Sequence, residues 1–236
     1  MACHRFGLRA LSISLVLGFG PNLYALPSGG VVTFGNAVIA NNLPNSLVIN
    51  QSSQNTILNW QSFGIGAAES VRFVQPGSNS VAINRVLGSD PSQIFGSLSS
   101  NGKVFLVNPN GILFGKGASI NVGGLLASAL EFTDADFVDW RYLFSGSGNG
   151  EVRNDGSIQT ANGGFVAMLG NRVRNEGTIT ADSGAVALAA GGAATVDIPI
   201  DGLIHVSVDK SAAGALASNG GLIQADGGAV LVTALA

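Results

Sequence analysis

The sequence predicts an all-β protein built as a parallel β-solenoid, and three observations support this prediction. Glycine accounts for 34 of the 236 residues, about twice the usual share of roughly 7%. The C-terminal half repeats one motif with a period of about 22 residues, and its apolar residues show no helical period. Charged residues make up 11% of the chain and hydrophobic residues 46%, so there is ample apolar surface to bury. The absence of a strict G-X-Y period excludes collagen.

Residues 1–25 have the parts of a secretory signal peptide. Arg5 and Arg9 form a positive n-region, and an apolar run over residues 10–19 follows before a Gly-Pro pair. This run is far shorter than the roughly 20 residues that span a bilayer. We therefore predict cleavage after Ala25 and export from the cytoplasm.

The composition of the remaining chain excludes several function classes. Removing the signal peptide takes away the single cysteine and two of the 11 basic residues against 14 acidic ones, which leaves a net charge of −5. No disulfide, cysteine nucleophile or thiolate metal site can then form. The scattered basic residues argue against nucleic acid, which requires a clustered positive face. The most apolar later segment, residues 184–200, contains Gly, Asp and Pro, so we expect no stable membrane insertion.

The repeat has the form N-x-G-x-I-x-[AT]-x-x-G-x-V-x-[LMV], and its copies begin at Asn154, Asn175 and Asn219. The last interval is double the first, which predicts a degenerate copy around residues 197–216. Each unit should supply two short strands with one inward face, separated by Asn and Gly turns. The leading Asn either stacks in a ladder from coil to coil or serves only as a turn residue. From Leu26 onward, about nine or ten coils of roughly 22 residues would fit.

An ordered set of motifs precedes the repeats. It consists of Trp60 with Phe63 and Gly66, Val71-x-Phe73 with Gln75-Pro76, Asn84-Arg85-Val86, Ser92-x-Ile94-x-Gly96, and Gly102-x-Val104-x-Leu106-x-Asn108-Pro109-Asn110-Gly111-Ile112-x-Phe114-Gly115. This set resembles the N-terminal two-partner-secretion, or haemagglutination activity, domain of filamentous haemagglutinin-like exoproteins. With the downstream repeats, the resemblance covers nearly the whole mature chain.

The resemblance implies a right-handed parallel β-helix with short extra-helical strands. It also implies export by the Sec route through the periplasm, recognition by POTRA repeats of an outer-membrane transporter, and templated β-helix folding at the cell surface. A host-cell or glycan receptor is a further implied partner. We divide the chain into a signal peptide (1–25), a secretion domain (26–145) and β-helical repeats (146–236). Because the chain stops within a repeat, we expect a truncated protein whose unpaired C-terminal sheet edge promotes self-association.

The tetrapeptide Asn108-Pro109-Asn110-Gly111 matches the family's NPNG motif residue by residue. Pro109 fixes its own φ and biases Asn108 to extended geometry, and Asn110-Gly111 suits a turn with positive φ. This predicts a corner between strands at 104–107 and 112–114. Two roles remain open, namely transporter recognition and positioning of the strands. The family's second motif, NPNL, is missing, because residues 42–45 read Asn-Leu-Pro-Asn.

Two groups of residues raise the question of an enzyme. Glu131, with Asp134, Asp136 and Asp139, suggests calcium or acid-base chemistry, but the spacing fits no calcium loop, so a solvated loop is favoured. His205 lies near acidic and Ser residues but lacks a nucleophile elbow. We expect His205 to occupy an exposed solenoid position.

We therefore predict a secretion domain of an adhesin-like exoprotein, with no enzymatic activity, metal or cofactor. One alternative is the delivery portion of a contact-dependent toxin. A less favoured alternative is a β-helical polysaccharide lyase, for which Arg141 or Arg153 beside the acidic group would serve as the base.

Overall fold

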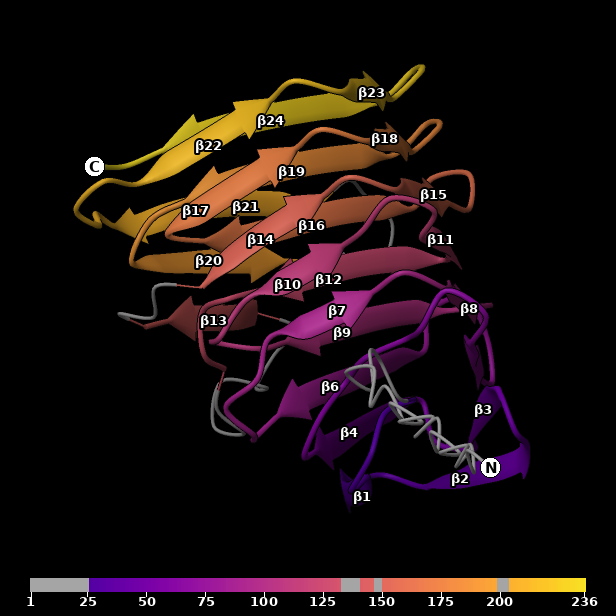
Figure 1. Cartoon of the computed structure of the whole chain (residues 1–236). Helices are drawn as coiled ribbons and strands as arrows, with labels where there is room; N and C mark the ends of the chain where they lie inside the picture. Colours follow the sequence, from indigo (N-terminus) through magenta and orange to yellow (C-terminus); the bar gives the residue numbers. More distant parts are fainter. Residues whose placement is uncertain (1–25, 133–140, 147–149, 199–203) are drawn as a thin grey trace, which may run out of the picture.

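The computed structural model describes residues 26–132, 141–146, 150–198 and 204–236. These residues form strands and turns only, arranged as stacked coils (Figure 1). None of the described segments is a helix long and apolar enough to cross a membrane. The predicted signal peptide and its cleavage after Ala25 lie outside the described residues.

Three sheets of stacked strands form the β-helix. Sheet 1 contains β1 (Val31–Phe34), β4 (Asn55–Trp60), β6 (Val81–Val86), β9 (Lys103–Val107), β12 (Gly124–Ser128), β16 (Phe165–Gly170), β19 (Ala185–Ala190) and β24 (Ala229–Ala234). Sheet 2 contains β2 (Ala37–Leu43), β3 (Ser46–Gln51), β5 (Ser70–Val74), β8 (Ser97–Ser100), β11 (Ser119–Val122), β15 (Ser157–Thr160), β18 (Thr178–Thr180) and β23 (Leu222–Gln224). Sheet 3 contains β7 (Ser92–Ile94), β10 (Ile112–Phe114), β14 (Glu151–Asn154), β17 (Arg172–Asn175) and β22 (Leu216–Asn219).

Neighbouring strands in these sheets are parallel, except at the N-terminal end. There β1 pairs antiparallel with β4, and β2 pairs antiparallel with β3. The prediction of a right-handed parallel β-helix with short extra-helical strands is confirmed. The sheets continue past the predicted boundary after residue 145, since β12 pairs directly with β16, and the division at that point stays a prediction.

The prediction of nine or ten coils is wrong, because the described residues form seven. Sheets 1 and 2 each contain seven strands in parallel succession, once the antiparallel β1 and β2 are set aside. The N-terminal strands and the segments outside the coils use the remaining length. The prediction of two strands per repeat is also wrong. A third strand, such as β14 or β17, ends at the Asn that begins the repeat motif and belongs to sheet 3.

The predicted degenerate repeat at residues 197–216 is not a coil. β20 (Ala193–Asp197) instead pairs antiparallel with β13 (Arg141–Ser145) on one side and with β21 (His205–Lys210) on the other, and the three strands form an extra-helical sheet. The stack of coils continues without a gap on either side of this insertion, because β17 pairs directly with β22 and β19 with β24. An alternation of apolar and polar residues suits this hairpin as well as it suits a coil.

The central strands of sheet 1, from β9 to β19, are buried on both faces. Their inward side chains fill the interior of the β-helix together with those of sheets 2 and 3, as with Leu106 and Leu125. Their outward side chains, including Phe105 and Phe165, pack against Tyr142 of the extra-helical sheet. The ring of Phe105 meets that of Tyr142 edge to face at 5.1 Å between centroids. The extra-helical sheet therefore covers the outer apolar face of the central strands of sheet 1.

Stacked glycines occupy the corner that precedes each strand of sheet 1 from β9 to β24. A Cβ atom on Gly164 would lie 2.3 Å from the carbonyl oxygen of Gly123, and one on Gly184 would lie 1.9 Å from that of Gly164. These distances are too short for any side chain, so backbones of successive coils approach more closely here than any other residue allows. This close approach explains part of the high glycine content.

Candidate functional site

The candidate site is the turn Asn108–Gly111, which connects β9 of sheet 1 to β10 of sheet 3. The amide of Gly111 donates to the carbonyl of Asn108 at 2.9 Å, which closes a β-turn with Pro109 and Asn110 at its centre. Proline at the second position, Asn at the first and Gly at the fourth are the preferences of a type I turn. The predicted corner and both flanking strands are confirmed, with β9 beginning one residue earlier at Lys103. Among the four residues of this turn, Gly111 alone has a positive φ, of 109°.

Asn108 holds the turn in place from the interior. Its side chain is 0% exposed and donates to the carbonyl of Asp90 and to the hydroxyl of Ser92, both at 3.0 Å. Its Oδ1 accepts from the amide of Asn110 at 3.0 Å, which makes an Asx-turn inside the β-turn. Both polar atoms of this side chain are thus used: Nδ2 joins the turn to the preceding coil, and Oδ1 braces the turn internally.

The other half of the turn faces solvent. Pro109 is half-buried and Asn110 is exposed. The Nδ2 atom of Asn110 donates to the carbonyl of Gly88 at 2.9 Å, so its exposed side chain is still held in one orientation. A partner could contact Pro109 and Asn110 without disturbing Asn108.

A cavity of about 420 Å³ opens beside this exposed half. Pro109 and Asn110 form part of its wall, and Arg85, Glu131 and Phe132 contribute a cation, an acid and an aromatic ring. The guanidinium carbon of Arg85 lies 5.9 Å from the centre of the Phe132 ring. The corner therefore presents both apolar and charged groups next to the turn.

Sequence reasoning missed the polar contacts that connect the other family motifs inside the core. The indole Nε1 of Trp60 donates to Oδ1 of Asn84 at 2.9 Å, and both residues are buried. The buried side chain of Gln75 donates to Oε1 of Gln51 at 3.1 Å, one coil below. Both Trp60 and Gln75 stood in the motifs, but their partners are neighbours only once the coils stack, so spacing alone could not identify them.

Of the two roles left open for the Asn that leads each repeat, the structure shows the ladder. Asn154 Nδ2 donates to Asn175 Oδ1 at 2.7 Å, and Asn175 Nδ2 donates to Asn219 Oδ1 at 2.7 Å. Asn154 and Asn175 are fully buried. The ladder thus continues across the insertion between β19 and β22.

The residues that raised the question of an enzyme are not brought together. Asp134, Asp136 and Asp139 lie outside the described residues. His205 is exposed as expected, but it lies on β21 of the extra-helical sheet and not in a coil, so that part of the prediction is wrong. Among the described residues, no three His, Cys, Asp or Glu side chains are placed to hold a metal ion.

Arg153 is engaged in an ion pair. Its Nε lies 2.7 Å from Oδ1 of Asp155. The hydrogen bond to Asp155 raises the pKa of the Arg153 guanidinium, which disfavours the neutral form that a catalytic base requires.

The stacked coils, the extra-helical sheet and the buried-Asn turn define the class of protein, a β-helical secretion domain. The chain belongs to the TPS secretion domain family, whose model matches residues 24–235. It therefore contains the secretion domain of an exoprotein that is exported to the cell surface or the extracellular space.

Two curated relatives are named heme/hemopexin-binding protein. One, from Haemophilus influenzae strain Rd, is 35% identical over 93% of this chain. The other, from Haemophilus influenzae, is 44% identical over 43% of the chain. This chain spans 25% of the first relative's length, and the match to the second covers 11% of its length.

Among solved structures, the chain is similar to the HMW1 secretion domain from Haemophilus influenzae. The TM-score is 0.79 and the sequence identity is 34%, over 86% of this chain and 55% of the other. The fold and the family therefore agree with the motifs in residues 58–130.

Proposed function

We propose that this domain directs export by binding the periplasmic POTRA repeats of an outer-membrane transporter, and that the turn Asn108–Gly111 takes part in this recognition. The observation that supports the proposal is the division of the turn into a buried half and an exposed half. Asn108 positions the turn, and Gly111 permits its conformation. Pro109 and Asn110 are the residues that a transporter would contact, together with the cavity beside them.

Secretion assays on single variants separate these roles. The chain is co-expressed with its cognate transporter and the released protein is quantified, while the melting temperature of each purified variant is recorded. Asn110→Ala should reduce release several-fold and change the melting temperature much less than Asn108→Ala does. It removes the hydrogen bonds from the exposed Asn110 Nδ2 to the Gly88 carbonyl at 2.9 Å and to Oδ1 of Asn108 at 3.2 Å, each contributing about 1 kcal/mol or less, and Oδ1 of Asn108 keeps the backbone amide of residue 110 as a donor. Asn108→Ala should reduce both release and stability. Wild-type release from Asn110→Ala would contradict direct recognition.

A matched control comes from another turn. Asn162 is an exposed turn asparagine in the connection between β15 and β16, far along the chain from the motif. Asn162→Ala should be released like the wild type. Equal loss from Asn162→Ala and Asn110→Ala would show that export responds to turn asparagines in general and not to this motif.

We also propose that the β-helix is not an enzyme and that each coil serves as the template for the next during export. The Asn ladder supports the template role, since each buried Asn supplies a donor to the following coil at a fixed register. Such contacts are made one coil at a time as the chain emerges.

A further inference from the structure

We propose that the outer face of sheet 2 binds a linear polysaccharide that contains uronic acid, with the sugar carboxylate on Arg72 and the chain running along the axis of the β-helix. This inference concerns a ligand of the exported domain and does not depend on the role of the Asn108–Gly111 turn. It starts from the side chains that sheet 2 turns outward.

Two rows of short polar side chains follow the outer face of sheet 2. The register of the parallel strands puts one row in line as Ser46, Ser70, Ser97, Ser119, Ser157 and Thr178. The second row, two residues further along each strand, runs Arg72, Ser99, Asn121, Gln159, Thr180 and Gln224. Hydroxyl and amide groups therefore recur at the strand spacing of about 4.8 Å.

Charge on this face is limited to one cation. Arg72 is exposed, and none of the sheet 2 strands contains an acidic residue. The charged residues Glu151, Arg153, Arg172 and Arg174 instead lie on sheet 3. The acidic residues nearest to these strands lie in the adjoining turns, among them Glu69 before β5 and Asp226, which accepts a hydrogen bond from Gln224 at 2.8 Å. Because the protein as a whole is acidic, strands without carboxylates are the part of the β-helix surface that an anionic ligand can approach.

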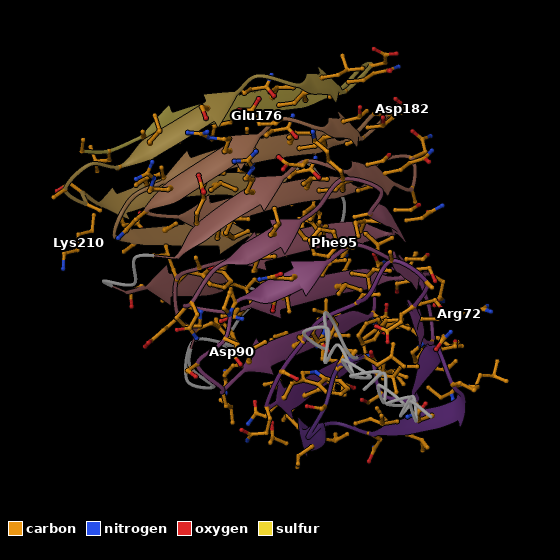
Figure 2. The ribbon with its side chains drawn as sticks, in the orientation of Figure 1. Arg72, Asp90, Phe95, Glu176, Asp182 and Lys210 are labelled. Carbon is orange, nitrogen blue, oxygen red and sulfur yellow. The ribbon has the colours of Figure 1, made fainter. Side chains whose placement is uncertain are left out.

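The polar groups around Arg72 are free to bind a ligand. Among the described residues, Arg72, Ser99 and Asn121 make no side-chain hydrogen bond or ion pair. Figure 2 shows the Arg72 side chain pointing away from the body of the β-helix. A hydroxyl-bearing ligand could therefore bind these side chains in place of solvent without breaking any contact within the protein.

The surface is hollowed at this place. A depression of about 590 Å³ is lined by Arg72, Val74, Ser99, Asn101 and Asn121, among others. The side chain of Asn101 is fixed, since its Oδ1 accepts from the amide of Gln75 and its Nδ2 donates to the carbonyl of Gln75, both at 2.8 Å. The depression thus has a rigid polar wall beside the guanidinium.

The chemistry of this face favours a sugar chain over other ligands. Nucleic acid requires many cations, and protein partners require apolar or aromatic anchors at the centre of the interface. A polysaccharide presents a hydroxyl group at nearly every carbon, and one sugar residue is close in length to the spacing between coils. A guanidinium binds a carboxylate through paired hydrogen bonds, which fits one uronic acid at Arg72.

Binding of a labelled hyaluronan hexasaccharide tests the proposal, because this sugar alternates uronic acid with neutral residues. Fluorescence anisotropy at about 0.15 M salt measures its affinity for the purified chain. We expect saturable binding that Arg72→Gln weakens at least tenfold and Asn121→Ala weakens severalfold. The methyl-esterified hexasaccharide, which has the same chain without charge, should bind at least tenfold more weakly.

The control variant is Arg172→Gln, which removes the same charge from an exposed side chain on β17 of sheet 3 and should leave binding unchanged. Arg72 is exposed, so its substitution should not alter the melting curve. The proposal is overturned if the wild type shows no saturable binding, if both arginine variants lose affinity equally, or if the esterified sugar binds as tightly as the acid.

Discussion

Replacing Asn175 by Ala should destabilise the β-helix more than the same change at either exposed asparagine, Asn219 or Asn162. In the native ladder Asn175 accepts from Asn154 at 2.7 Å and donates to Asn219 at 2.7 Å. A net hydrogen bond contributes about 1 kcal/mol, and a buried donor left unpaired costs about 1–3 kcal/mol. Asn154 is fully buried and would keep only the carbonyl of Thr178, at 3.4 Å, as an acceptor for its Nδ2, whereas Asn219 is exposed and water can replace its partner.

These terms predict a loss of about 2–4 kcal/mol for Asn175→Ala. Asn219→Ala should cost about 1 kcal/mol, since it removes the last ladder bond and leaves the Nδ2 of Asn175 near the carbonyls of Gly177 and Leu222, each at 3.4 Å. Asn162→Ala, in an exposed turn, should change stability by less than about 0.5 kcal/mol.

Urea unfolding followed by circular dichroism measures these differences as shifts of the midpoint. The slope with urea should stay the same in all variants, because a changed slope would mean that coils unfold separately. Equal losses for Asn175→Ala and Asn219→Ala would refute the reasoning, since they would show that burial of the ladder does not matter. An unchanged Asn175→Ala midpoint would show that the ladder contributes no stability.

Three further predictions follow from close contacts in the core. Gly164→Ala should cost about 1–3 kcal/mol because its Cβ would meet the Gly123 carbonyl at 2.3 Å, whereas Gly77→Ala, with nothing within 4 Å, should be tolerated in the same urea assay. Trp60→Phe should cost about 1–3 kcal/mol by leaving the buried Oδ1 of Asn84 without its donor, again seen as a midpoint shift. Burial raises the pKa of Tyr142 from 10.0 to about 12; since the folded pKa is the higher one, stability should be complete below pH 10 and fall as the pH rises towards 12. Tyr142→Phe should lose this alkaline dependence. Alkaline absorbance titration of the chain without residues 1–25, in which Tyr142 is the one tyrosine of the sequence, should show no tyrosinate near pH 10 before unfolding.

The sequence predicted the features that depend on local chemistry. Asn108-Pro109-Asn110-Gly111 combines the preferences of one turn, so the corner could be placed with its flanking strands. Asn154 and Asn175 occupy the same position in successive repeats, so their side chains could be placed in one column, although the sequence left open whether they form a ladder or serve only as turn residues. In each case the residues that determine the structure are adjacent or repeat at a constant interval.

The features that depend on pairing across long separations were not predictable in the same way. The strands of sheet 3 have three or four residues each, too few to show a period of two. The sequence of β20 and β21 alternates as a coil strand does, and only the antiparallel contact with β13 assigns them to an extra-helical sheet. The sequence likewise does not show that Ser99 and Asn121 stand beside Arg72, because their alignment depends on the register between coils.

The geometry of the fold separates the two proposed surfaces, and this makes them independently testable. The Asn108–Gly111 turn lies at the corner between sheets 1 and 3, while Arg72 lies on the outer face of sheet 2. Sheet 1 cannot provide a ligand surface over its central strands, because the extra-helical sheet covers it. A variant at Arg72 should therefore be exported normally and lose only sugar binding, and a variant at Asn110 should bind sugar normally once purified and lose only export. Loss of both properties from either exposed substitution would mean that the surfaces are coupled through folding.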